Sequence, residues 1–196
     1  MAEAHEQTEH AEHVEHIAHS NKNVALLIAV IALFLAFSET LGKSAQTNAI
    51  GHNVESSDLW AFFQAKTIRM TVLRTAADAV SLAASVADPA AKAAIEKQVD
   101  NWKKTAARYD DEPETGEGRK QLSERAKDAE HRRETSLARY HQFEVASAAF
   151  QIGIVLASAS VITGMVLLAW IAGGLGVAGI VLMGVGIFAP HAVHLF

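Results

Sequence analysis

The C-terminal stretch from Val145 to Phe196 contains no Asp, Glu, Lys or Arg, although these residues make up 20% of the chain. A helix that crosses the hydrocarbon core of a bilayer needs about 20 predominantly apolar residues. The stretch is long enough for two such helices. We therefore expect two membrane spans, over residues 145–170 and 171–189, followed by a C-terminal tail at 190–196.

A third apolar run, from Val24 to Phe37, lies near the N-terminus. Extended to Leu41, it gives a helix of roughly 27 Å, which is short but sufficient for a span. A cleavable signal peptide would begin with a short basic region, whereas residues 1–20 are acidic and His-rich. We expect residues 24–42 to be a retained span; the alternative is a buried helix of a soluble domain.

The polar residues 43–144 predict a helical extramembrane domain between the first and second spans. Residues 42–53 are expected to be a connector, and a first helix is expected to begin at Ser57 or Asp58, either of which can cap it. It should end at Asp88, because Pro89 lacks an amide hydrogen and restricts the residue before it. A second helix is expected over residues 90–109.

An acidic loop at residues 110–118 separates this second helix from a third that begins near Arg119. No helix breaker separates the third helix from the apolar stretch. We therefore expect one continuous helix to about Trp170, followed by a tight turn at Gly173 and Gly174.

The middle helices carry thin, Ala-rich apolar seams like those of a coiled coil. Their thinness indicates that these helices complete their core against another subunit. The first helix is indicated by seven apolar residues at spacings of three, four or seven: Ala61, Ala65, Ile68, Val72, Ala79, Leu82 and Val86.

Basic residues indicate the orientation of the spans. Of the 17 Lys and Arg residues, only Lys22 precedes the first span, and all the others lie between Lys43 and Arg139. Cytoplasmic segments of membrane proteins retain an excess of basic residues. We expect the middle domain and the C-terminus to be cytoplasmic and the N-terminal tail to lie on the other side.

Several function classes lack support in the sequence. The formal net charge of −5 does not suggest nucleic-acid binding, and the absence of Cys excludes thiolate metal sites and Cys nucleophiles. No catalytic motif is present, so we expect neither an enzyme nor a cofactor. The G-x-G-x-x-G string at residues 174–179 lies in an apolar run without a βαβ unit, which favours helix packing over dinucleotide binding.

Residues 1–23 form an acidic tail in which Glu and His each recur every third residue. Neutral imidazoles bind Zn, Ni or Cu, and His titrates near pH 6.5. The tail is therefore a candidate metal site or pH sensor, with a solvated, low-complexity helix as the alternative. The candidate metal ligands are His10, His13, His16 and His19.

Two further groups of residues are candidates for function. Glu39 lies near the end of the first span, where an ionisable residue is costly and often functional; it either pairs with Lys43 or lines a subunit interface or ion path. Trp60 begins a segment that either packs within the hairpin or contacts lipid head groups or a partner subunit. The polar residues of that segment are Gln64, Lys66 and Arg69.

The order of segments resembles one known family. An E-H-x-rich tail precedes a span ending in LAFSETLGK, a helix opening with SSDLWAFFQAKTIR, a charged helical region and an apolar C-terminal hairpin. This arrangement is similar to the bacterial family catalogued as domain of unknown function 4337. The resemblance implies a small bacterial membrane protein with three spans, and it implies no activity, substrate or catalytic residue.

We therefore expect an all-α protein of the bacterial inner membrane, in contact with lipids, with a cytoplasmic helical hairpin or bundle between its first and second spans. The preferred function is a non-catalytic homo-oligomeric scaffold. The alternatives are an oligomeric channel or transporter with Glu39 near the conduction path, and a protein that responds to metal or pH through its His-rich tail.

Overall fold

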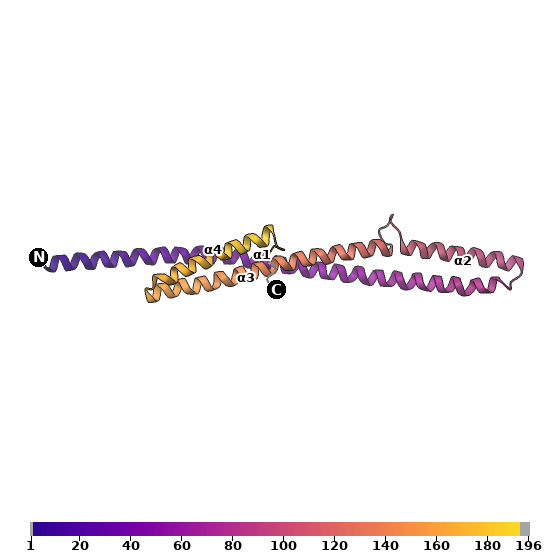
Figure 1. Cartoon of the computed structure of the whole chain (residues 1–196), viewed down its shortest axis with the longest axis horizontal. Coiled ribbons are helices and arrows are strands. Elements are labelled where there is room, and N and C mark those ends of the chain that lie inside the picture. The colour runs from indigo at the N-terminus through magenta and orange to yellow at the C-terminus, as the bar shows by residue number, and fades with distance from the viewer. Residues whose placement is uncertain (1, 193–196) are drawn as a thin grey trace. The chain divides into compact units, whose positions relative to one another are not determined.

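The computed structural model describes the backbone of residues 2–192 and the side chains of residues 22–192. Four helices, α1 Ala2–Ala84, α2 Pro89–Asp110, α3 Arg119–Thr163 and α4 Val166–Phe188, account for the fold (Figure 1). No strand occurs among residues 2–192. The expected all-α class is confirmed.

The chain divides into two compact units, which we call the terminal unit and the middle unit. The terminal unit comprises Met1–Asn48 and Thr135–Phe196, and the middle unit comprises Ala49–Glu134. Both α1 and α3 contribute to each unit.

Helix α1 is continuous where we expected a connector at residues 42–53 and a new helix at Ser57 or Asp58. The expected break is wrong, because the segment has no proline and its small residues pack along one face. Ala45 and Ala49 are 6% and 3% exposed. A Cβ at Gly42 would lie 3.4 Å from the Phe143 Cβ, so this glycine serves a close helix approach.

Asp88 and Pro89 separate α1 from α2 as expected. The Asp88 carboxylate accepts hydrogen bonds from the amides of Ala90 and Ala91, both at 3.0 Å. These bonds satisfy amides that have no partner within the helix, and Pro89 occupies the first turn, where its missing amide hydrogen costs nothing.

The turn between α3 and α4 lies at Gly164 and Met165, so the expected helix to Trp170 and turn at Gly173–Gly174 are wrong. Gly164 has a φ of +72°, a left-handed conformation that glycine adopts readily. The Ser160 hydroxyl donates to the Met165 carbonyl at 2.9 Å and closes the turn. The charge-free part of α3 therefore covers residues 145–163, and α4 forms the other arm of the hairpin.

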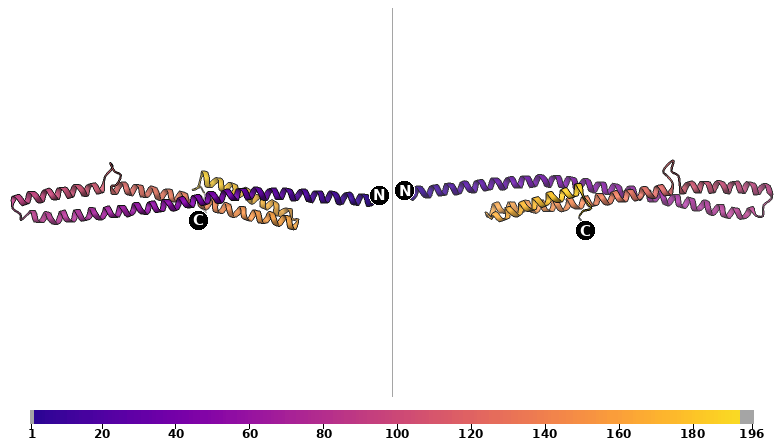
Figure 2. Two further views of the ribbon diagram at one scale, coloured as in Figure 1. Left: turned by 180° about the vertical axis from the view of Figure 1, so that it is seen from behind. Right: turned by 45° about the horizontal axis from the view of Figure 1, so that its top comes forward.

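Three helices are long and apolar enough to cross a membrane: Lys22–Ala84, Arg119–Thr163 and Val166–Phe188. In the terminal unit α3 and α4 lie side by side in every view (Figures 1 and 2). Large apolar side chains on these helices stay exposed, among them Leu26 at 65% and Trp170 at 77%. Such surfaces are suited to lipid.

The terminal unit has a small core formed by Ile31, Ala146 and Phe150. Glycines let the helices approach it closely. A Cβ at Gly179 would lie 2.6 Å from the Phe150 ring, and one at Gly176 would lie 3.3 Å from Ile31. These two glycines belong to the G-x-G-x-x-G string, and they perform the helix packing expected of it.

In the middle unit the second half of α1 runs beside α2 and the start of α3, with the loop at residues 111–118 projecting between these helices (Figure 2). The buried core comprises Leu59, Leu122, Ala126 and Ala129, with Trp60 and Phe63 packed against it. The middle unit is therefore a helical hairpin.

Candidate functional site

The middle unit exposes an apolar stripe along α1, which we call the outer seam. Its large members are strongly exposed: Ile68 at 64%, Val72 at 60% and Leu82 at 75%. The outer seam comprises Val54, Ala61, Ala65, Ile68, Val72, Ala79 and Leu82. Six of its seven residues belong to the apolar stripe that indicated this helix in the sequence, and α2 and α3 leave that stripe uncovered.

The buried face of α1 in the middle unit, the inner seam, has the same spacings of three, four or seven residues. Its members are Leu59, Phe63, Lys66, Met70, Ala77 and Ala84. Because Lys66 lies at its centre, this face has no continuous apolar periodicity in the sequence. Helix α1 thus has two seams with the same spacing, of which α2 and α3 cover one.

Gln64 and Arg69 are exposed and lie beside the outer seam. If Ala65 and Ile68 are assigned to heptad positions a and d, Gln64 occupies position g and Arg69 position e. These positions line the edges of a helix–helix contact. Both predicted site residues are therefore at the border of the exposed apolar surface.

Trp60 packs within the hairpin. Its Nε1 donates to the Glu130 carboxylate at 2.8 Å, and its ring meets Phe63 edge to face at 5.4 Å between centroids. The Ser56 hydroxyl donates to the same Glu130 oxygen at 3.5 Å. Of the two roles considered for Trp60, the structure supports packing in the hairpin.

Lys66 is 5% exposed and fixes the acidic loop to α1. Its Nζ lies 3.7 Å from Glu112 and 3.6 Å from Glu117. The ammonium also lies over the rings of Phe62 and Tyr109, at 5.3 and 5.1 Å from their centroids. The position of the charge between two carboxylates and two ring faces compensates for its removal from water.

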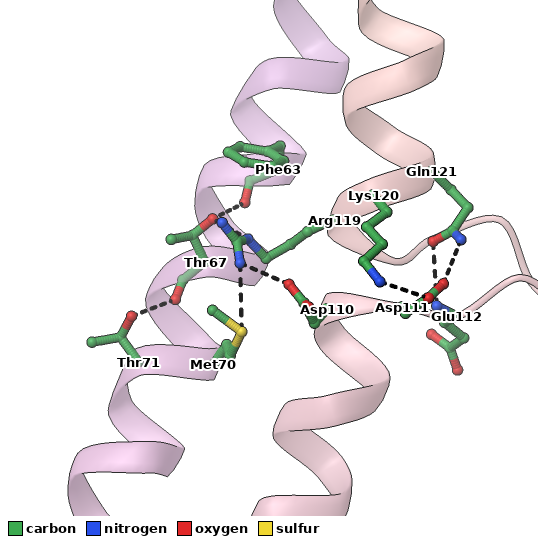
Figure 3. A network of polar contacts seen from close by, with 10 residues as sticks. All are labelled: Phe63, Thr67, Met70, Thr71, Asp110, Asp111, Glu112, Arg119, Lys120 and Gln121. Atoms are coloured by element: carbon green, nitrogen blue, oxygen red, sulfur yellow. Dashed lines mark hydrogen bonds and ion pairs between the residues drawn. The ribbon is translucent and has the colours of Figure 1, made fainter.

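Arg119, at the first turn of α3, makes a second set of contacts that sequence reasoning missed. Its guanidinium donates to Thr67 Oγ1 at 2.8 Å and to Asp110 Oδ1 at 2.9 Å (Figure 3). The same group lies 4.8 Å from the Phe63 ring centroid. These contacts join all three helices of the middle unit. The only sequence signal was an arginine directly after an acidic loop.

Two loop carboxylates, Glu112 and Asp111, have further cationic partners. The Arg108 guanidinium hydrogen-bonds Glu112 and lowers the pKa of that carboxyl. Hydrogen bonds from Gln121 and Lys120 lower the pKa of Asp111. Among the described residues no group of three His, Cys, Asp or Glu side chains could hold a metal ion. The ion pairs around the loop between α2 and α3 therefore stabilise the hairpin.

Glu39 lies on the exposed side of the terminal unit and accepts a hydrogen bond from Gln151 Nε2 at 3.4 Å. Within the described part of the chain no ion pair joins Glu39 to Lys43, which is itself exposed. The neighbouring Ser38 is fully buried, and its hydroxyl donates to the Phe143 carbonyl at 2.9 Å. Glu39 and Gln151 thus form an exposed polar pair on two apolar helices.

The candidate metal ligands of the tail, His10, His13, His16 and His19, lie outside the residues whose side chains the structure describes. Metal binding and pH sensing by the tail stay predictions.

The fold defines an all-helical protein with three helices of membrane-spanning length and composition and a charged helical hairpin. The sequence pattern of the family described as domain of unknown function (DUF4337) matches residues 20–189. The chain belongs to this family. No curated protein and no solved structure matches it.

Proposed function

We propose that the chain is an integral membrane protein of the bacterial inner membrane with three spans. The spans are the apolar part of α1, the charge-free part of α3 and helix α4. The middle unit lies in the cytoplasm, because the basic residues are concentrated between Lys43 and Arg139. This orientation returns the C-terminus to the cytoplasm as well.

We further propose that the protein is a homo-oligomeric scaffold whose copies meet along the outer seam. In the terminal unit lipid accounts for the exposed apolar side chains, but in the charged middle unit it does not. Full burial of an Ile, Val or Leu side chain stabilises by about 1.5–3 kcal/mol. The exposed Ile68, Val72 and Leu82 thus favour association with a further helix, and the heptad spacing fits another copy of α1.

The membrane restricts how two copies can meet. All copies share one orientation across the bilayer, so neighbouring α1 helices run parallel. In a parallel pair the residue at position g contacts the residue at position e five places later on the neighbour. Gln64 and Arg69 are five residues apart, so the amide oxygen of Gln64 would accept a hydrogen bond from Arg69 of the neighbouring copy.

An ion channel is the second candidate, and the exposed Glu39–Gln151 pair favours it. Polar and ionisable groups facing hydrocarbon are costly and usually face a helix interface or a water-filled cavity. A neighbouring subunit would remove the pair from lipid in either case. The two functions differ in whether water or lipid occupies the centre of the assembly beside Glu39.

Light scattering on the full chain in detergent tests the scaffold. We expect a particle containing several 21.0 kDa chains. Substitution of Ile68→Ser together with Val72→Ser should raise the dissociation constant at least tenfold, because each change removes about 1.5–3 kcal/mol of apolar burial.

The matched control is Ala93→Ser with Lys97→Ser, at exposed positions of the same spacing on α2. It should keep the wild-type mass. A monomeric wild-type protein contradicts the proposed assembly, and an unchanged dissociation constant in the seam variant contradicts the role of the outer seam.

A further inference from the structure

The terminal unit contains a pocket of about 290 Å³ where its three helices meet near the ends of their apolar segments. Helix α1 contributes Ser44 and Asn48, and α3 contributes Ser136 and Arg139. Side chains of Leu41, Phe143 and Ile187 complete the walls. One side of the lining is therefore polar and cationic, and the other is apolar.

Arg139 is the only charged residue that lines this pocket. Among the described residues it has no ion-pair partner, unlike Arg108, Arg119 and Arg132 in the middle unit. Two hydroxyls and an amide accompany the guanidinium. Such donors match the oxygens of a phosphate group, which a guanidinium can bind with two parallel hydrogen bonds.

The pocket lies at the depth of lipid phosphates if the apolar segments span the bilayer as proposed above. Arg139 lies roughly 9 Å along α3 from Val145, where the charge-free stretch begins, and Asn48 lies roughly 10 Å along α1 beyond Leu41. The headgroup layer on each side of the hydrocarbon is about 5–8 Å thick. The backbones of Arg139 and Asn48 therefore lie at its aqueous edge, and Ser44, roughly 5 Å beyond Leu41, lies within it. The buried Ser38–Phe143 hydrogen bond ties the two helices at the inner edge of this layer.

We propose that this pocket binds the phosphate headgroup of an anionic phospholipid in the cytoplasmic leaflet. The pocket volume of about 290 Å³ is close to the smallest volumes of small-molecule sites, about 300 Å³. The pocket is therefore suited to a single headgroup. The apolar wall formed by Leu41, Phe143 and Ile187 receives the beginning of the acyl chains. The inference rests on the proposed membrane placement but not on the oligomeric assembly.

Native mass spectrometry of the delipidated full chain, titrated with phosphatidylglycerol or phosphatidylcholine, tests the proposal. We expect the wild-type protein to prefer phosphatidylglycerol, and Arg139→Gln to weaken its binding about fivefold, the usual contribution of one basic residue near a membrane surface. Arg139→Lys should keep part of the preference. Arg125→Gln, an exposed residue of the middle unit, is the matched control and should bind as the wild type does.

Equal affinity of the wild-type protein and Arg139→Gln for phosphatidylglycerol would overturn the site. Displacement of the lipid by millimolar inorganic phosphate would show that free phosphate is the ligand and would overturn the assignment to lipid. Failure of the chain to enter vesicles would contradict the membrane placement itself, which separates that result from a failure of the pocket alone.

Discussion

Substitution of Gly179→Ala tests the close packing of α4 on α3. The added Cβ would lie 2.6, 2.7 and 2.9 Å from three atoms of the Phe150 ring. That ring is fully buried and stacks on Phe34 at 6.2 Å between centroids. Neither the ring nor the helix backbone can yield without disturbing the core of the terminal unit.

Two effects of opposite sign determine the result. Alanine in place of glycine inside a helix stabilises by about 1 kcal/mol. Overpacking a tight core destabilises by about 1–3 kcal/mol. Gly184→Ala, on the same helix, supplies the first effect alone, because apart from its chain neighbours and the local helix backbone no atom lies within 4 Å of the Cβ position at Gly184. We therefore expect Gly179→Ala to be about 1–3 kcal/mol less stable than Gly184→Ala.

Equilibrium unfolding of both variants in mixed micelles, followed by the Trp170 fluorescence of a chain in which Trp60 and Trp102 are replaced by Phe, measures this difference. If Gly179→Ala is as stable as Gly184→Ala, Phe150 does not pack on Gly179 and the described approach of the two helices is incorrect.

The remaining predictions concern charged residues. Lys66→Met should destabilise the middle unit by roughly 1–3 kcal/mol in urea unfolding, because it leaves Glu112 and Glu117 without their shared cation, whereas the exposed Lys97→Met should be near neutral. Because the pKa values of Asp111 and Glu112 are lowered in the folded state, their stabilisation should be complete above about pH 4.5 and be lost at more acidic pH, as urea unfolding between pH 7 and pH 3 would show. Glu39→Gln should abolish any ion flux through reconstituted protein if the channel function holds, and unchanged flux together with unchanged assembly would remove Glu39 from both roles.

Features set by local chemistry could be predicted from the sequence. The absence of charge from Val145 onward identified two apolar helices, because a charge-free stretch of that length is typical of helices that can cross a bilayer. Asp88 and Pro89 marked a helix boundary because both act on the adjacent backbone. The family resemblance, carried by the segments around Glu39 and Trp60, is confirmed by the match over residues 20–189.

Features that depend on distant partners could not be predicted. Gly164 and the pair Gly173–Gly174 are equally permissive, so the presence of glycine does not determine which of them forms the turn. The inner and outer seams of α1 have the same period, so periodicity cannot say which one α2 and α3 cover. The hydrogen bonds of Arg119 depend on Thr67, which is 52 positions away in the sequence, and on the position of the loop.

Thiol crosslinking in native membranes tests the pairing of parallel α1 helices along the outer seam. The chain has no cysteine, so a single introduced thiol reports one position without further changes. Ile68→Cys should form a dimer with a short bismaleimide, because equivalent residues face one another across a parallel seam. Arg74→Cys, exposed but off the seam, should stay monomeric. Efficient crosslinking at Arg74 and none at Ile68 would contradict pairing along the outer seam.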